Sequence, residues 1–149
     1  MDNKDGYLFR LIIRPKELNH SKDRNWVTEL LQLEPTGGHE LGDITTAAKY
    51  NSAKQYDYWS WEYGLEWQKY WTENGKPSFS ENLFGFLQSL PSSKMIWDQL
   101  NNHCECSLYI PVERSNFLIE MEFESDIWEE LLKRNLKLQI SALSKHGKN

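Results

Sequence analysis

Acid–base chemistry has one candidate segment in this chain, the run from Gly37 to Asp43. His39 stands there next to Glu40 and four residues before Asp43. A histidine within hydrogen-bond reach of a carboxylate can move protons near neutral pH. The run is no phosphate-binding loop, because the Gly-Lys-Ser/Thr ending is missing. We favour the simpler interpretation, a turn-rich loop whose glycines adopt positive φ, and we assign no catalytic residue.

A second cluster that could do chemistry runs from His103 to Cys106 and holds both cysteines of the chain. A structural zinc site needs four ligands, and no second Cys or His pair has suitable spacing. Thiols two positions apart on a strand lie about 6–7 Å apart, too far for a disulfide. We therefore predict two buried, reduced thiols, with no metal site and no cofactor.

Carboxylates gather near the end of the chain. Glu120, Glu122 and Glu124 alternate, so on a strand they share one face at a spacing of about 7 Å. Such a row is either a solvated sheet face balanced by basic residues on neighbouring strands, or a patch that docks a basic protein. The row lacks the turn oxygens of a calcium loop, and we predict no metal there either.

Aromatic residues are densest between Tyr56 and Trp71. Trp59, Trp61 and Tyr63 fall at period two, which predicts one buried face of a strand. The remaining rings exceed what one strand face needs, and exposed Trp and Tyr side chains commonly anchor protein interfaces. Together with the acidic row, they give the predicted partner-binding set: Glu120, Glu122, Glu124, Asp126, Tyr58, Tyr63, Trp67 and Trp71.

The elements that must position these residues follow from hydrophobic periodicity and capping residues. Strands are predicted over residues 6–14, 56–63, 104–112, 117–124 and 136–140. Helices are predicted from Ser21 or Asp23 to Leu33, from Ser78 or Ser80 to Leu90, from Ser92 or Ser93 past Leu100, and from Ser125 to Arg134. Their inward residues are predicted to include Met95, Ile96, Ile127, Trp128, Leu131 and Leu132. Residues 39–55 are predicted to be a long loop.

These elements predict a fold class. Strands with one apolar and one polar face fit a mixed, mostly antiparallel sheet with helices on one side. We expect an α+β two-layer sandwich with about five strands and helices packed on one face. Residues 1–143 are expected to form a single domain, and residues 144–149 a loose tail.

The charge balance narrows the possible partners. The chain has 149 residues, a formal net charge of −5 and seven tryptophans. An acidic chain is a poor general binder of nucleic acid, but it suits a basic protein partner. No apolar segment at the start resembles a signal peptide, and no apolar run is long enough to span a bilayer. We expect a cytoplasmic protein without nucleic-acid or membrane contacts, a monomer or weak dimer.

Several segments in order resemble a bacterial family, the domain-of-unknown-function family numbered 4279. They are the Leu33-Glu34-Pro35-Thr36 run after the first helix, the Gly42-Asp43 pair, the strand from Tyr58 to Glu62, and the last helix with the strand that follows it. The resemblance covers roughly Tyr7 to Leu143. Some members resemble immunity partners of secreted toxins, and no catalytic residues accompany the family.

We therefore expect a non-catalytic protein-binding module. The favoured hypothesis is an immunity protein that neutralises a toxin effector by covering its active site. One alternative is an enzyme or small-molecule-binding domain that uses the His39–Asp43 loop with an aromatic wall. Another is an accessory subunit of a larger complex.

Overall fold

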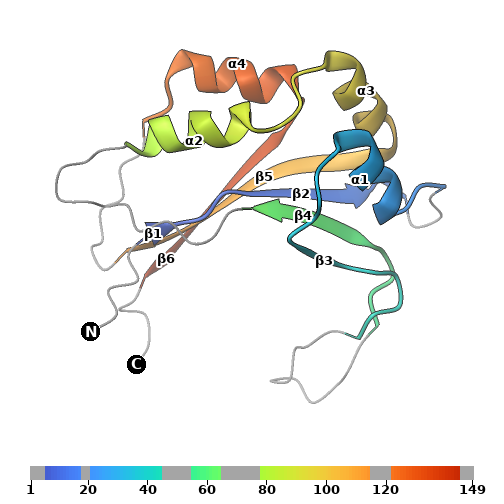
Figure 1. The fold of residues 1–149 in the computed structure, drawn as a ribbon. Coiled ribbons are helices and arrows are strands. Elements are labelled where there is room, and N and C mark those ends of the chain that lie inside the picture. Colours follow the sequence, from blue (N-terminus) through green and yellow to red (C-terminus); the bar gives the residue numbers. More distant parts are fainter. Residues whose placement is uncertain (1–5, 18–20, 45–54, 65–77, 115–121, 145–149) are drawn as a thin grey trace.

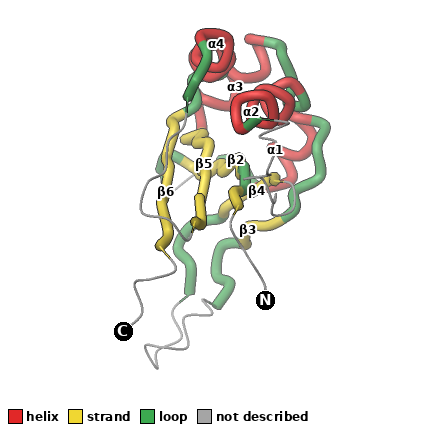
Figure 2. Tube along the Cα trace, turned by 90° about the vertical axis from the view of Figure 1, so that its left-hand side faces the viewer, coloured by secondary structure: helices red, strands yellow, loops and turns green. Residues whose placement is uncertain are grey.

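The computed structural model describes residues 6–17, 21–44, 55–64, 78–114 and 122–144. Four helices lie together on one side of a single sheet (Figure 1, Figure 2), which confirms the α+β class and the one-sided helix layer. The helices are α1 (Arg24–Leu31), α2 (Phe79–Gln88), α3 (Lys94–His103) and α4 (Ser125–Lys133). The strands are β1 (Gly6–Tyr7), β2 (Arg10–Pro15), β3 (Gly37–His39), β4 (Ser60–Gly64), β5 (Cys104–Arg114) and β6 (Lys137–Ser144).

Strand β5 organises the sheet. It pairs with β1 and β2 along one edge and with β6 along the other, and β4 and then β3 extend the sheet beyond β2. The β5–β6 pair is parallel and the other pairs are antiparallel. The prediction of a mixed, mostly antiparallel sheet is therefore confirmed.

The predicted first strand is divided into β1 and β2, although both keep one register against β5. Leu8, between them, donates its backbone N–H to the carbonyl of Pro111 at 3.2 Å. Pro111 has no N–H with which to return that bond. The ladder is therefore interrupted at this point without a change of register.

The apolar face of the sheet packs under the helices, as the alternation predicts. Cys104, Cys106, Leu108 and Ile110 of β5 are all buried. Burial raises the pKa of the Cys104 thiol to about 12, with Lys16 acting in the opposite direction. Both cysteines are free, which confirms the prediction of buried thiols.

Trp59 and Trp61 connect β4 to α1 and to the residues just before it. Trp59 and Trp61 are 2 % and 0 % exposed, which confirms the prediction that they belong to the core. The Trp61 indole N–H donates to the hydroxyl of Thr28 at 3.0 Å, and that of Trp59 donates to the carbonyl of Lys22 at 2.9 Å. Burial of large rings is favourable when their polar atoms find such partners.

Most helix ends follow the predicted caps. The Asp23 carboxylate accepts from Trp26 N at 2.9 Å, and the Ser78 hydroxyl accepts from Glu81 N at 3.1 Å. Asn135 adopts the predicted left-handed conformation, with φ 51°. The prediction that Ser125 caps α4 is wrong, because Glu124 occupies the N-cap and Ser125 is the first helical residue.

The prediction that Met95, Trp128 and Leu132 point into the core is wrong. Met95, Trp128 and Leu132 are 70 %, 45 % and 78 % exposed. The buried stripes are narrower than predicted, and α4 buries only Ile127 and Leu131. Trp97, which we did not assign to the core, is fully buried in α3.

Two strand predictions also need correction. Residues 122–124, the described end of the predicted 117–124 strand, are not in a strand, and the Glu122 carbonyl instead accepts a hydrogen bond from the Ser80 hydroxyl. The rest of that predicted strand, residues 117–121, lies outside the described residues. β4 begins at Ser60 rather than Tyr56, and β3 lies within a segment for which no strand was predicted.

A buried arginine joins the helices to one another. Arg134, at the end of α4, is 1 % exposed and forms an ion pair with Glu130 one turn earlier. Its guanidinium also donates to the carbonyl of Pro91 at 3.2 Å and lies 5.8 Å from the centre of the Trp97 ring. The Trp97 indole donates to the same Pro91 carbonyl at 2.7 Å. One side chain thus connects α4, the α2–α3 turn and α3.

Replacement of Arg134 by alanine should lower the free energy of unfolding by about 3–5 kcal/mol, since it removes the buried cation that pairs with Glu130 and one of the two donors to the Pro91 carbonyl. Lys133→Ala is the matched control: Lys133 is more exposed and lies 3.9 Å from the same carboxylate. Its effect should stay below about 0.5 kcal/mol. Urea unfolding of both variants checks the difference, and equal midpoints would contradict the role assigned to Arg134.

Acid should weaken the same contact. The hydrogen bond from Arg134 holds the pKa of Glu130 below its ordinary value of 4.5. Glu130 therefore contributes stability that is fully present above pH 4.5 and is lost as the pH falls through its folded-state pKa. The stability difference between wild type and Glu130→Gln, measured by urea unfolding, should shrink over this acidic range. Glu129→Gln, on the exposed side of α4, is the control. A stability difference for Glu130→Gln that does not depend on pH would contradict the proposed role of Glu130 in acid sensitivity.

Candidate functional site

The face of the sheet opposite the helices is the first candidate surface. No described helix or strand packs on it (Figure 1, Figure 2). Because paired residues share a face, the strand registers give its composition. One row across the sheet contains Arg10, Tyr109 and Gln139, and a second contains Glu62, Ile12, Ser107 and Lys137. We call these two rows, with Arg14 and Glu105, the open face.

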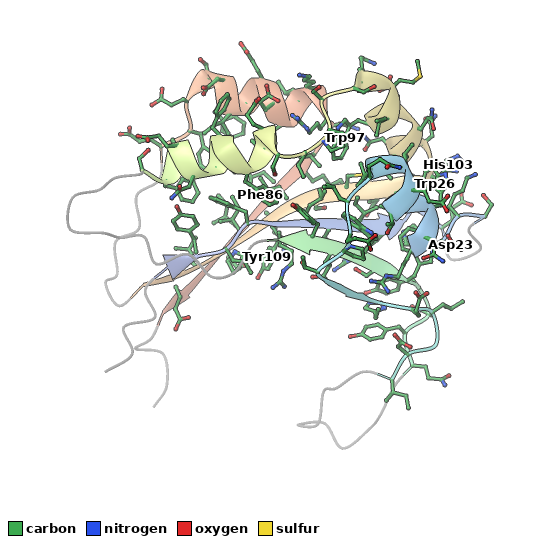
Figure 3. The ribbon with its side chains drawn as sticks, viewed as in Figure 1. Asp23, Trp26, Phe86, Trp97, His103 and Tyr109 are labelled. Atoms are coloured by element: carbon green, nitrogen blue, oxygen red, sulfur yellow. The ribbon has the colours of Figure 1, made fainter. Side chains whose placement is uncertain are left out.

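Charges on the open face are paired within the sheet. Arg10 lies 3.5 Å from Glu62, and Lys137 lies 3.4 Å from Glu105. The Arg14 guanidinium is 5.7 Å from the centre of the Tyr58 ring. Figure 3 shows Tyr109 at the sheet and Phe86 on the helix side. The open face therefore presents aromatic and guanidinium groups attached to regular strands, with few rotamers left to order on binding.

A hollow adjoins the open face beside β3. Its volume is about 680 Å³, and it is lined by Gly38, His39, Gly42, Asp43, Ile44, Tyr56 and Glu62. The rings of His39 and Tyr56 are stacked, with centroids 3.4 Å apart and planes at 11°. Tyr58 meets His39 edge to face at 5.3 Å. The predicted combination of the His39–Asp43 loop with an aromatic wall is thus present.

Two polar atoms beside this hollow lack partners. His39 Nδ1 and Ser60 Oγ are both buried without a hydrogen bond, and the two residues are paired across β3 and β4. An unpaired buried polar atom costs about 1–3 kcal/mol, so such atoms call for a functional explanation.

Asp43 is engaged in the turn rather than with His39. Its carboxylate accepts from Glu40 N at 2.8 Å, and its backbone carbonyl accepts from Tyr56 N at 2.9 Å. Within the described residues, no hydrogen bond joins His39 to a carboxylate. The Asp43 carboxylate therefore stabilises the turn that it closes rather than the His39 ring.

The predicted partner-binding residues fall on different parts of the molecule. Tyr58 lies at the hollow, whereas Tyr63 turns toward the helices and stacks on Phe86 at 6.1 Å. Glu122, Glu124 and Asp126 are exposed just before and within the first turn of α4. Glu120, Trp67 and Trp71 lie outside the described residues. The structure therefore joins Tyr58 to a surface that the sequence did not indicate, with Arg10, Arg14, His39 and Tyr109.

Other chemistry can be judged only for the described part of the chain. There, no group of three or more His, Cys, Asp or Glu side chains is arranged to hold a metal ion. None of the described helices has the length and apolar character needed to cross a membrane.

A one-sided α+β sandwich with an exposed polar sheet face is the class that this geometry defines. The family model described as "Domain of unknown function (DUF4279)" matches residues 18–145. The chain belongs to this family, which confirms the resemblance seen in the sequence, although the match begins after β2 rather than near Tyr7. No curated protein and no solved structure matches the chain.

The hollow depends on glycine at position 38. Gly38 has φ +110°, and a Cβ built there would lie 2.1 Å from the carbonyl oxygen of Ser60. Gly38→Ala should therefore detach β3 from β4 and lower the free energy of unfolding by about 2–3 kcal/mol. Urea unfolding and amide exchange at His39 measure the two effects.

Two glycine variants serve as controls. Gly42 has φ +88° but no atom within 4 Å of the added Cβ, so Gly42→Ala should cost only about 1 kcal/mol of backbone strain. Gly85 lies in α2 with open space around it, and Gly85→Ala should stabilise by about 0.5–1 kcal/mol. If Gly38→Ala cost no more than Gly42→Ala, the close approach of β3 to β4 would not matter.

Proposed function

We propose that this chain is a non-catalytic protein-binding module, and that it acts as an immunity protein which neutralises a toxin effector by covering its active site. The observation that carries the proposal is the open face with its adjoining hollow. Tyr and Arg side chains dominate the energetic centres of protein interfaces, and here they stand on strands that already fix their positions. A rigid sheet face of this kind is suited to occlusion of a partner's surface.

Charge supports the choice of a basic partner. The chain carries a net charge of −5, and Glu122, Glu124, Asp126 and Glu129 are exposed at the start of α4. Long-range attraction accelerates encounter with a positively charged domain, even where those carboxylates are not in the final contact. A basic nuclease-like effector is the partner class that fits both features.

Tyr56 and His39 give the interface a centre. Their stacked rings form one wall of the hollow, and the unpaired His39 Nδ1 and Ser60 hydroxyl lie beside it. A partner side chain entering the hollow would pack against these rings and exclude water, as interface hot spots require. Ile44, which lines the hollow, and Leu41 in the same loop are 63 % and 58 % exposed and would be covered in the complex.

The proposal is tested first by affinity capture from the native host, with the product of the neighbouring gene co-expressed. We expect one stoichiometric partner with a basic effector domain, whose toxicity is suppressed by this chain. Recovery of no partner, together with unchanged toxicity of the neighbouring product, would contradict the immunity role.

Kinetic measurements on the captured complex should then distinguish residues that contact the partner from charges that only accelerate its association. Arg14→Ala on the open face and Tyr58→Ala beside the hollow each remove a side chain proposed to contact the partner, and each should raise the dissociation rate by about tenfold or more. Met95→Ala is the control, because Met95 is exposed on the helix layer. Equal dissociation rates for all three variants would exclude the open face from the interface.

Reversal of the acidic charges should affect association instead. Glu122→Lys combined with Glu124→Lys should slow association, and more so at low salt, since steering is screened as ionic strength rises. Glu29→Lys combined with Asp98→Lys makes the same change in net charge at exposed positions on α1 and α3. If both pairs slow association equally, net charge alone steers the partner. An unchanged rate for both would contradict a basic partner.

A further inference from the structure

A separate cavity lies at the end of the sheet, where β2 ends, α1 begins and α3 meets β5. Its volume is about 180 Å³. Three basic side chains line it: Lys16, Lys22 and His103. Ser21 and Asn102 add neutral hydrogen-bonding groups, and the buried Trp59 forms part of the wall. This grouping of basic residues stands out in a chain whose net charge is −5.

The lining is held in place by contacts between distant segments. Lys16 N donates to the carbonyl of His103 at 3.1 Å, which joins the end of β2 to the end of α3. The Lys22 carbonyl accepts the Trp59 indole N–H at 2.9 Å, which holds the start of α1 against the residue before β4. These bonds position the backbone on three sides of the cavity before any ligand enters.

Trp26 orients two of the basic groups. The Lys22 ammonium lies 5.2 Å from the centre of the Trp26 ring, and the His103 ring meets Trp26 edge to face at 5.5 Å. Figure 3 shows Trp26 and His103 together at this end of the molecule, with Asp23 nearby. The Asp23 carboxylate accepts from Trp26 N at 2.9 Å and so is engaged in capping α1. A cation–π contact of this kind attracts the Lys22 ammonium to the face of the Trp26 ring.

The charge balance of the lining is positive. Among the described residues that line the cavity, Glu17 is the one carboxylate, and it stands against Lys16, Lys22 and His103. Ammonium, hydroxyl and amide groups can all donate to the oxygens of an anion. A cavity of this size is smaller than the roughly 300–1,000 Å³ of most drug-sized ligand sites. It therefore suits one small charged group rather than a nucleotide.

We infer that this cavity is a binding site for a small oxyanion, a phosphate or a carboxylate group. The site is separate from the open face, and it lies between α1, α3 and the ends of β2 and β5. An anion there could accept hydrogen bonds both from Lys16 after β2 and from Asn102 and His103 at the end of α3, and would so link these two elements. Occupancy should therefore also stabilise the folded chain, since a ligand of the native state shifts the unfolding equilibrium.

The inference is tested by titrating the full chain with inorganic phosphate at constant ionic strength. Nitrogen–proton correlation spectra are recorded at each phosphate concentration. We expect saturable shifts of the Trp59 indole and of the Lys16, Lys22 and His103 amides. Lys16→Gln and Lys22→Gln should each weaken binding by about threefold to fivefold. Lys94→Gln, which removes an exposed lysine paired with Asp98 on α3, should leave the affinity unchanged.

An equal titration with acetate separates the two kinds of oxyanion. Tighter binding of phosphate supports a phosphate ligand, and tighter binding of acetate supports a carboxylate, including one on a protein side chain. The inference is overturned if neither anion gives saturable shifts at this cavity. It is also overturned if Lys94→Gln weakens binding as much as Lys16→Gln and Lys22→Gln, because phosphate would then be bound by exposed lysines in general.

Discussion

A sheet covered by helices on one side only is the constraint on which the rest of this structure depends. The alternation of β5 and β2 sends Leu108, Ile110, Leu11 and Ile13 into the core, and the same alternation must send their neighbours outward. Most of those neighbours are polar or amphipathic, and Ile12 is the apolar exception among the residues of the open face. The open face is thus a direct consequence of how the core is built, and a change of strand register by one residue would exchange the two faces.

The helices are held to one another and to the sheet by contacts that lie away from that face. Arg134 draws α4, the α2–α3 turn and Trp97 together, and Trp59 and Trp61 hold α1 to the sheet. Neither group of contacts uses a residue of the open face. Substitutions that disturb binding can therefore be separated from substitutions that disturb folding, which is what a test of a binding surface needs.

Much of this architecture could be predicted from the sequence, because it rests on local periodicity. The alternation from Cys104 to Ile110 and the caps at Asp23 and Ser78 each depend on a few consecutive residues. β3 could not be predicted in this way, since Gly37 and Gly38 have no side chains to alternate and pair with β4 through close backbone approach. Buried Arg134 was also missed, because arginine is rarely buried unless paired. Glu130 four residues earlier was the available signal.

The candidate sites, too, could be predicted only where they depend on consecutive residues. The His39–Asp43 loop and the aromatic segment were both recognised, but their contact through the His39–Tyr56 stack depends on how the chain returns to the sheet. The cavity around Lys16, Lys22 and His103 gathers residues from segments that are far apart in sequence. No spacing rule applies to such a set. Sites assembled by topology become visible only when the strand order is known.

The central claim is that the open face, together with the hollow beside it, is the surface by which this chain binds a protein partner. Hydrogen exchange of the chain, free and in the captured complex, measures this most directly. The account predicts slower exchange in the complex at the amides of β3 and β4 and at residues 40–44 and 55–59, with little change in α2 and α3. Protection confined to the helix layer, with exchange at β3 and β4 unaltered, would contradict it.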